Sequence, residues 1–396
     1  MRYGTKKQQT LLLIIVCLFW FAQYVYIPFQ TTYLTARQVS EAYIGGILGA
    51  YGIAQLVMRL PVGVLADSVG KHKLFILTGT VAAGIASLLR ISMPGGTGFF
   101  IANLLSGFAS SMWISFMVMF TGFFPLEQQQ KATSRIILFN NLGILLGFIS
   151  STYFYKFYGM SFLCLLSIAS AFAATILTLF ITDVKAKVGR SFIFTLKDSL
   201  GICSNKRLLL FSVLALIQQG IQMSSTMSFT TQILKNLGAS TLLIGLSSII
   251  YMLSAVTFSA LASFPCFTKK GPAFWIPGVF ILLGAYCFLI PLVTPYALIL
   301  SLQLLPGLAT GILFSYITSE AMKGIKPQVK STAMGFYQAV YAIGMTLVPL
   351  FTGNVVSRFS MKTAYFYLAG LAAAGCIISL IYYRRSRRHP QPQNHI

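Results

Sequence analysis

Side chains that could perform acid–base chemistry or bind a metal are scarce in this sequence. The 396 residues include six acidic residues and three histidines, and His72, His389 and His395 fall in a predicted loop and in the C-terminal tail. An enzyme site needs such groups to converge, but no two acidic residues share one face of a predicted helix. We therefore expect neither an enzyme nor a bound metal or cofactor.

Neutral polar side chains are more plentiful, and they recur at helical spacing. Gln23, Tyr26 and Gln30 follow Phe19 at positions that share one face of a helix. Glutamine both donates and accepts hydrogen bonds, so such a face can bind a small molecule, although it can also join helices to one another. The candidate cavity residues of this kind are Gln23, Tyr26, Gln30, Asn103, Gln218, Gln222, Gln303, Gln338 and Tyr341.

The elements that must position these residues are membrane helices. The chain is 56% apolar and 9% charged, and its mean hydropathy is +0.79, far from the balance of a soluble domain. Its apolar residues come in runs of about 20, the length of a membrane-spanning helix. Spans of this length must be helical, because an unpaired backbone amide in lipid costs several kcal/mol. We therefore predict an all-α integral membrane protein.

The runs predict about twelve spanning helices, arranged as two halves of six. The N-terminal half covers residues 1–184, a linker loop 185–206, the C-terminal half 207–383 and a basic tail 384–396. The expected spans are 10–34, 42–66, 73–92, 97–123, 132–155, 161–183, 207–234, 241–264, 273–293, 295–322, 330–353 and 362–383.

The positive charges predict how the chain crosses the membrane. Most of the 29 Lys and Arg residues fall in the terminal segments and in the loops on the same side as the N-terminus, which the positive-inside rule assigns to the cytoplasm. The charges form no basic face, so we expect no nucleic-acid partner. The first apolar run has no cleavage site and is predicted to be a retained helix. Arg59 alone is placed within a span, and the outer segments hold Arg37, Arg90, Lys156, Lys235, Arg358 and Lys362.

The two halves also resemble each other in sequence. LLSGFAS at 104–110 aligns with LLPGLAT at 304–310, which places Gly107 opposite Gly307. Repeated halves around a central loop are typical of transporters, whose binding site lies at the midplane between the repeats. The repeat therefore predicts a site between the halves.

The segment GVLADSVGKHK at 63–73 carries the most specific pattern in the chain. It resembles the loop motif G-x-L-A-D-R-x-G-R-[KR] of the major facilitator superfamily, with matches at Gly63, Asp67, Gly70 and Lys71. With the predicted helices and halves, the resemblance covers nearly the whole chain. It implies the twelve-helix fold of that family, in which helices 1, 4, 7 and 10 line the cavity.

The resemblance also implies a gate at the cytoplasmic side. In that family the Asp bridges to the start of the eleventh helix, which here is Lys330, Ser331 and Thr332. Asp67 is therefore expected to hold that side shut, with Gly63 allowing close helix packing. The alternative is that the loop only anchors the topology. Arg59 lies one turn before the end of its helix. In one interpretation its side chain extends to the membrane interface or pairs with a neighbouring residue, and in the other it serves the gate or binds a substrate anion.

Some residues depart from the family pattern. Ser68 replaces the usual Arg of the motif, and Ser263 stands where the second half would carry the Asp. Asn103 occupies the Arg position of the R-x-x-x-G motif, and the drug-antiporter motif is reduced to Gly143 and Gly147. These losses weaken the assignment as a proton-coupled multidrug efflux transporter, which stays the alternative.

The expected function is secondary active transport of a small solute by alternating access. Because no cation or carboxylate is predicted at the midplane, the solute is expected to be neutral or amphipathic. Import or export stays open, and any proton coupling would use Glu41, Asp67 or Glu320. We expect a monomer in the plasma (inner) membrane, with lipid and a small-molecule substrate as its partners. A non-transporting receptor on the same scaffold is a remote alternative.

Overall fold

The computed structural model describes residues 5–183, 201–202 and 204–388. All regular structure in these residues is helical, as predicted. Most of the linker predicted at 185–206 and the tail after residue 388 lie outside the described residues.

The N-terminal half consists of helices that follow the predicted spans closely. The apolar run predicted as one helix at 10–34 is divided, because the chain turns before Pro28 and then restarts as a second helix. The elements are α1 (Lys6–Tyr24), α2 (Ile27–Ala36), α3 (Glu41–Val69), α4 (His72–Ser92), α5 (Gly96–Ser111), α6 (Trp113–Gly122), a 3-10 turn (Leu126–Gln128) and α7 (Gln129–Leu179).

The C-terminal half contains more interrupted helices. Two π-helical turns break the spans predicted at 207–234 and 295–322. The elements are α9 (Lys206–Ser224), a π turn (Ser225–Phe229), α10 (Thr230–Asn236), α11 (Thr241–Leu261), α12 (Pro265–Lys270), α13 (Pro272–Leu289), a 3-10 turn (Ile290–Leu292), α14 (Tyr296–Leu302), α15 (Leu304–Leu308), a π turn (Ala309–Leu313), α16 (Phe314–Met322), a 3-10 turn (Pro327–Val329), α17 (Lys330–Arg358) and α18 (Met361–Arg388).

Eleven helical segments of the described chain are long and apolar enough to cross a membrane. One of them, α7, has 51 residues, and its backbone turns at Gly159, whose φ of 69° and ψ of −169° are not helical. A positive φ of this kind is readily adopted by glycine. Gly159 therefore divides α7 into the two spans predicted at 132–155 and 161–183.

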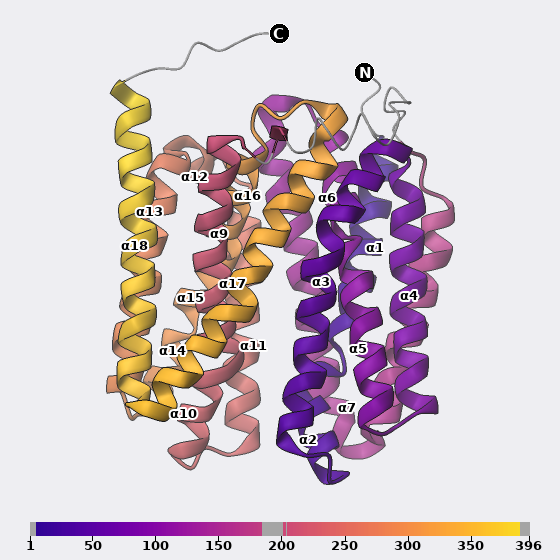
Figure 1. Ribbon diagram of the computed structural model, residues 1–396, viewed down its shortest axis with the longest axis vertical. Helices are drawn as coiled ribbons and strands as arrows, with labels where there is room; N and C mark the ends of the chain where they lie inside the picture. The colour runs from indigo at the N-terminus through magenta and orange to yellow at the C-terminus, as the bar shows by residue number, and fades with distance from the viewer. Residues whose placement is uncertain (1–4, 184–200, 203, 389–396) are drawn as a thin grey trace.

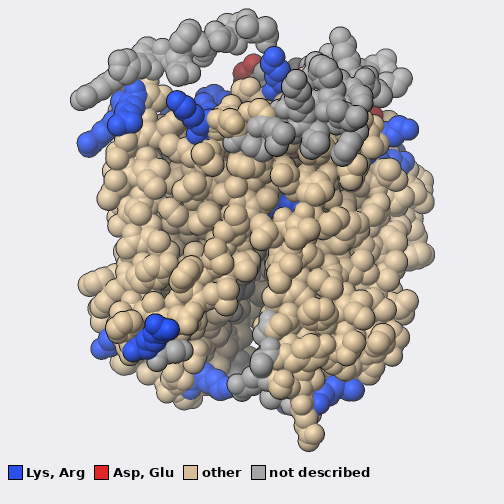
Figure 2. Space-filling model, in the orientation of Figure 1, with Lys and Arg blue, Asp and Glu red and all other residues tan. Residues whose placement is uncertain are grey.

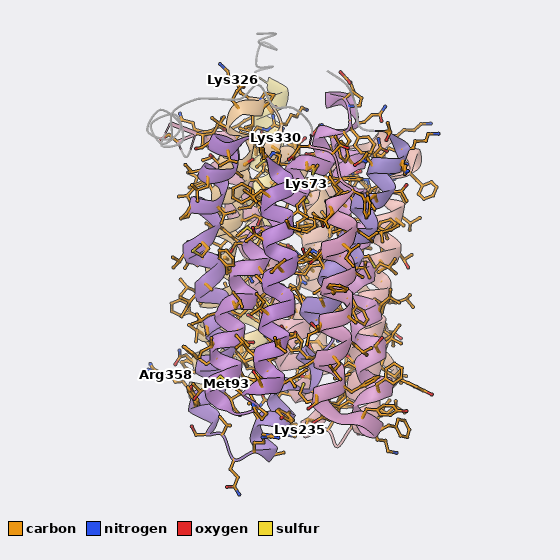
Figure 3. All side chains as sticks on the ribbon, turned by 90° about the vertical axis from the view of Figure 1, so that its right-hand side faces the viewer. Lys73, Met93, Lys235, Lys326, Lys330 and Arg358 are labelled. Carbon is orange, nitrogen blue, oxygen red and sulfur yellow. The ribbon has the colours of Figure 1, made fainter. Side chains whose placement is uncertain are left out.

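The helices form two bundles that stand side by side (Figure 1). The N-terminal half is on the right of the view and the C-terminal half on the left, with α17 leaning across toward α3 at the top. We call the end at which α1 begins and α18 ends the Lys330 end. Lys73, Lys326 and Lys330 lie there, whereas Met93, Lys235 and Arg358 lie at the opposite end (Figure 3). Figure 2 shows Lys and Arg gathered at both ends, with a largely uncharged belt between them.

The sequence repeat corresponds to a repeated helix contact. A Cβ atom on Gly107 would lie 2.4 Å from the carbonyl oxygen of Tyr51, and one on Gly307 would lie 2.5 Å from that of Tyr251. Only glycine permits so close a backbone approach without displacement. Each half therefore packs the corresponding pair of helices at the same position, and this brings Tyr51 and Tyr251 to the space between the halves.

Candidate functional site

A narrow cavity of about 80 Å³ lies between the two halves. Its walls combine aromatic rings, methionines and side-chain amides, and Arg59 is the only charged residue among the described residues that line it. Figure 2 shows the surface hollowed between the halves toward the end opposite the Lys330 end. The lining residues are Trp20, Tyr24, Tyr51, Gln55, Arg59, Trp113, Asn140, Asn141, Ile144, Gln219, Gln222, Met223, Tyr251, Met252, Thr310, Phe314, Tyr341 and Met345.

Arg59 connects the halves at one wall of this cavity. Arg59 is 3% exposed, so neighbouring residues enclose it almost completely. Nη1 donates to the carbonyl oxygen of Gln338 in α17 at 2.8 Å, Nη2 donates to the side chain of Gln55, and the guanidinium lies 4.6 Å from the ring centroid of Tyr341. The guanidinium therefore binds neutral groups of both halves.

The two tyrosines of the repeat form matching hydrogen bonds. The hydroxyl of Tyr51 lies 2.8 Å from Oγ of Ser110, and that of Tyr251 lies 2.9 Å from Oγ1 of Thr310. Gln222 adds a hydrogen bond to the hydroxyl of Tyr251. Each half thus fixes one tyrosine at the cavity through its hydroxyl.

Arg90 is not in an outer segment, as the sequence predicted, but buried within the N-terminal half. It is 2% exposed, and its Nη2 donates to Oδ1 of Asn103 at 2.8 Å and to Oγ of Ser106 at 2.9 Å. The guanidinium lies 3.8 Å from the ring centroid of Tyr26. Neither Arg90 nor Arg59 forms an ion pair with a described carboxylate. The sequence analysis expected no cation at the midplane, and the structure shows two guanidinium groups buried inside the protein, those of Arg59 and Arg90.

The structure separates the predicted cavity residues into two groups. Gln222 and Tyr341 line the cavity, whereas the other seven lie outside its lining. Gln23 donates to Ser106 and Ser110, and Tyr26 and Asn103 surround Arg90. The remaining residues are Gln218, which donates to Gln222; Gln303, which donates to Tyr286; Gln338, whose carbonyl accepts from Arg59; and Gln30, whose amide has no partner among the described residues.

Asp67 caps the helix that begins across the interface from it. Its two carboxylate oxygens accept hydrogen bonds from the backbone amides of Ser331 at 2.9 Å and Thr332 at 2.6 Å, in the first turn of α17. Asp67 thus supplies acceptors to the first turn of a helix, the position where backbone amides lack a preceding turn and the helix dipole favours an anion. A Cβ on Gly63 would lie 2.6 Å from the carbonyl oxygen of Ser331, so α3 and α17 cross here almost in backbone contact.

The other residues of the motif shape the loop that follows Asp67. Gly70 ends α3 with a φ of 64°, and the exposed Lys71 precedes α4. The amide of Lys73 then donates to Oδ1 of Asp183 at 3.0 Å. Burial raises the pKa of the Asp183 carboxyl, and the hydrogen bond from Lys73 opposes that rise. Asp183 therefore caps α4 as Asp67 caps α17, but within one half.

Further contacts join the halves at the Lys330 end. Nζ of Lys330 donates to Oε1 of Gln129 at 2.8 Å, and the side chain of Gln130 donates to the carbonyl of Ala262 at 3.1 Å. Between this end and the cavity, Asn141 donates to Oγ of Ser259 at 2.9 Å. These hydrogen bonds and the α3–α17 crossing close the Lys330 end against the cavity.

Several cavity residues were missed from the sequence. Trp20, Gln55 and Asn140 line the cavity, but they stand in apolar helices without a motif. Arg90 carried a signal that its assignment to an outer segment overlooked: it falls in the last turn of the predicted span 73–92, where a charged residue is costly and needs polar partners. Asn103 and Ser106, which supply those partners, lie on the following helix.

Relatives of known sequence match parts of the chain. It is 33% identical over 84 residues to the uncharacterized MFS-type transporter MJ1560 of Methanocaldococcus jannaschii, covering 21% of this chain and 22% of that protein. It is 29% identical over 127 residues to monocarboxylate transporter 10 of Rattus norvegicus, covering 28% of this chain and 25% of that protein. The match thus spans about a quarter of the length of these relatives.

Solved structures match nearly the whole fold. The human organic anion transporter MFSD10 superposes with a TM-score of 0.77 at 15% identity, covering 95% of this chain and 100% of that one. The Escherichia coli fucose:proton symporter FucP superposes with a TM-score of 0.74 at 14% identity, covering 93% and 98%. At these identities the likeness shows the fold alone. The sequence model of the Major Facilitator Superfamily matches residues 12–349 and 214–396. The chain therefore belongs to the Major Facilitator Superfamily.

Proposed function

We propose that this protein is a secondary active transporter that moves a small amphipathic solute across the membrane by alternating access. The observation that carries the proposal is the cavity between two pseudo-symmetric halves, which hydrogen bonds and a close helix crossing separate from the Lys330 end. At about 80 Å³, the cavity is smaller than the 300–1,000 Å³ of typical ligand sites. Binding a solute therefore requires the halves to move apart.

The gate is proposed to be the contact between α3 and α17. Asp67, Gly63 and the first turn of α17 hold the Lys330 end closed, and Lys330 with Gln129 strengthens the closure. Opening that end breaks these bonds, and closing the opposite end requires new contacts there. Each state then exposes the cavity to one side.

The lining of the cavity supports an amphipathic solute. Rings such as Trp20 and Trp113 offer apolar area, and amides such as Gln222 offer hydrogen bonds. The expectation of a neutral solute rested on the lack of a charged group at the midplane, and the presence of Arg59 in the cavity lining opposes that argument.

The alternatives differ in what they require. Proton-coupled multidrug efflux would be favoured by a carboxylate in the cavity, whereas the described lining contains none. A receptor on the same scaffold would bind a ligand without opening its cavity alternately to the two sides of the membrane.

We further propose a monomer in the plasma (inner) membrane with both termini in the cytoplasm, following the charge pattern. The family membership favours a transporter over an enzyme.

The test is the accessibility of a single cysteine in the cavity. Met223→Cys, in a variant lacking the native cysteines, is reconstituted in sealed vesicles and exposed to a membrane-impermeant maleimide from either side. Alternating access predicts labelling from both sides. Lys235→Cys and Lys326→Cys, at opposite ends (Figure 3), are the controls and should each react from one side only. Labelling of Met223→Cys from a single side under all conditions would favour the receptor.

A further inference from the structure

The buried polar atoms that lack a partner in the cavity wall are all hydrogen-bond donors. Among the described residues that line the cavity, these atoms are Nε1 of Trp20, Nε of Arg59 and Nδ2 of Asn140. An unsatisfied buried donor costs about 1–3 kcal/mol, so a ligand that supplies acceptors regains that free energy. The wall is therefore complementary to a group with several acceptor oxygens and no donor.

Arg59 adds a full positive charge to these donors. Its guanidinium is buried and binds only neutral groups: a carbonyl, a side-chain amide and the face of Tyr341. Removing an ion from water costs several kcal/mol, and this cost is offset best by an opposite charge. No described residue of the lining supplies one.

We propose that the solute is an organic monoanion whose carboxylate is bound by Arg59 and by the indole of Trp20. This proposal rests on the proposed transport function and names the class of its substrate. A single guanidinium balances a single negative charge, and it binds carboxylates through two parallel hydrogen bonds. The rings and methionines around it enclose the apolar body of the solute.

The same residue links recognition to movement of the halves. Nη1 of Arg59 in α3 donates to the carbonyl of Gln338 in α17, so it is one of the bonds that hold the halves together. A carboxylate is a stronger acceptor than a neutral carbonyl. When the anion binds, it takes this donor from Gln338 and weakens the contact between α3 and α17.

The experiment compares acids with their neutral amides on the purified full-length protein. Indole-3-acetate is paired with indole-3-acetamide, and phenylacetate with phenylacetamide, in thermal-shift and calorimetric titrations. Each pair keeps the ring and changes the charge. In the wild type, the acids should raise the melting temperature and the amides should not. This comparison requires no variant.

The variants then assign the contacts. Arg59→Gln should raise the Kd of the acid by about ten- to a hundredfold, as expected for the loss of a hydrogen bond to a charged group. Trp20→Phe keeps a ring but removes the donor and should weaken the acid. Trp275→Phe is the matched control, since Trp275 lies outside the cavity lining and its indole donates to the carbonyl of Phe267.

The proposal is wrong if neither acid binds, if an amide binds as tightly as its acid, or if Arg59→Gln binds the acid unchanged. These outcomes differ from failure of the proposed function. A transporter of another substrate class would still expose Met223→Cys to both sides of the membrane, whereas a protein without alternating access would not.

Discussion

Asp67→Asn should open the Lys330 end. In the closed state the Asp67 carboxylate accepts two backbone hydrogen bonds, at 2.9 and 2.6 Å, from the first turn of α17. Asparagine has one acceptor oxygen and no charge, so at least one bond is lost and the other is no longer charge-assisted. Hydrogen bonds to charged groups contribute about 1.5–3 kcal/mol. The ratio of closed to open molecules should therefore fall by about ten- to a hundredfold.

The assay is a distance measurement between spin labels across the Lys330 end. The labels are attached to cysteines that replace Lys131 in the N-terminal half and Lys326 in the C-terminal half, two residues that are exposed. Double electron–electron resonance then reports the distribution of distances between the two labels. Asp67→Asn should shift that distribution toward longer distances. The matched control is Asp183→Asn, which removes a carboxylate that caps α4 within one half and should leave the distribution unchanged.

Two results would refute this reasoning. If Asp67→Asn keeps the wild-type distances and the wild-type transport rate, Asp67 anchors the topology and does not serve a gate. If Asp183→Asn widens the distances as much as Asp67→Asn does, the effect arises from loosening of the loops and not from the contact between the halves.

The remaining predictions use other positions. Gly63→Ala should also open the Lys330 end, because its Cβ would lie 2.6 Å from the carbonyl oxygen of Ser331. Gly49→Ala is the control, since its Cβ would have no atom within 4 Å. Equal spin-label distances in the two variants would contradict the role of the α3–α17 crossing. A cysteine at Thr195 should react only from the cytoplasmic side, and labelling from outside would reverse the topology. Gln222→Ala should weaken ligand binding directly, whereas Gln23→Ala should lower the melting temperature, since it bonds only behind the cavity; equal losses of affinity would contradict this division.

The helices were predictable because a bilayer imposes one length on every span. Hydropathy located the apolar part of each, but it missed where helices continue into water, as α18 does to Arg388. Hydropathy also missed the turn between α1 and α2 and the two π turns, because these interruptions occur without any change in the apolar composition of the chain. Gly159 ends a span with a single residue of positive φ, and the sequence placed that boundary within a few residues.

The candidate site was predictable only in part, for a physical reason. The contact of Asp67 with the start of α17 followed from a local motif and from the affinity of a helix N-terminus for an anion. Which face of a helix meets the cavity depends instead on the packing of all its neighbours. Gln23 and Gln222 have the same residue type in corresponding helices, yet one bonds behind the cavity and the other lines it. Arg90 was placed outside because its partners lie on another helix.

Arg59 has an electrical consequence as well. A charge inside the span experiences part of the transmembrane potential, and a full crossing is worth about 2.3 kcal/mol per 100 mV. Since Arg59 is buried without a described carboxylate, any change in its depth or in its access to either side makes the two states of the empty protein unequal under voltage. A bound monoanion cancels that charge. Membrane voltage should then act mainly on the return of the empty carrier and leave the loaded step nearly electroneutral.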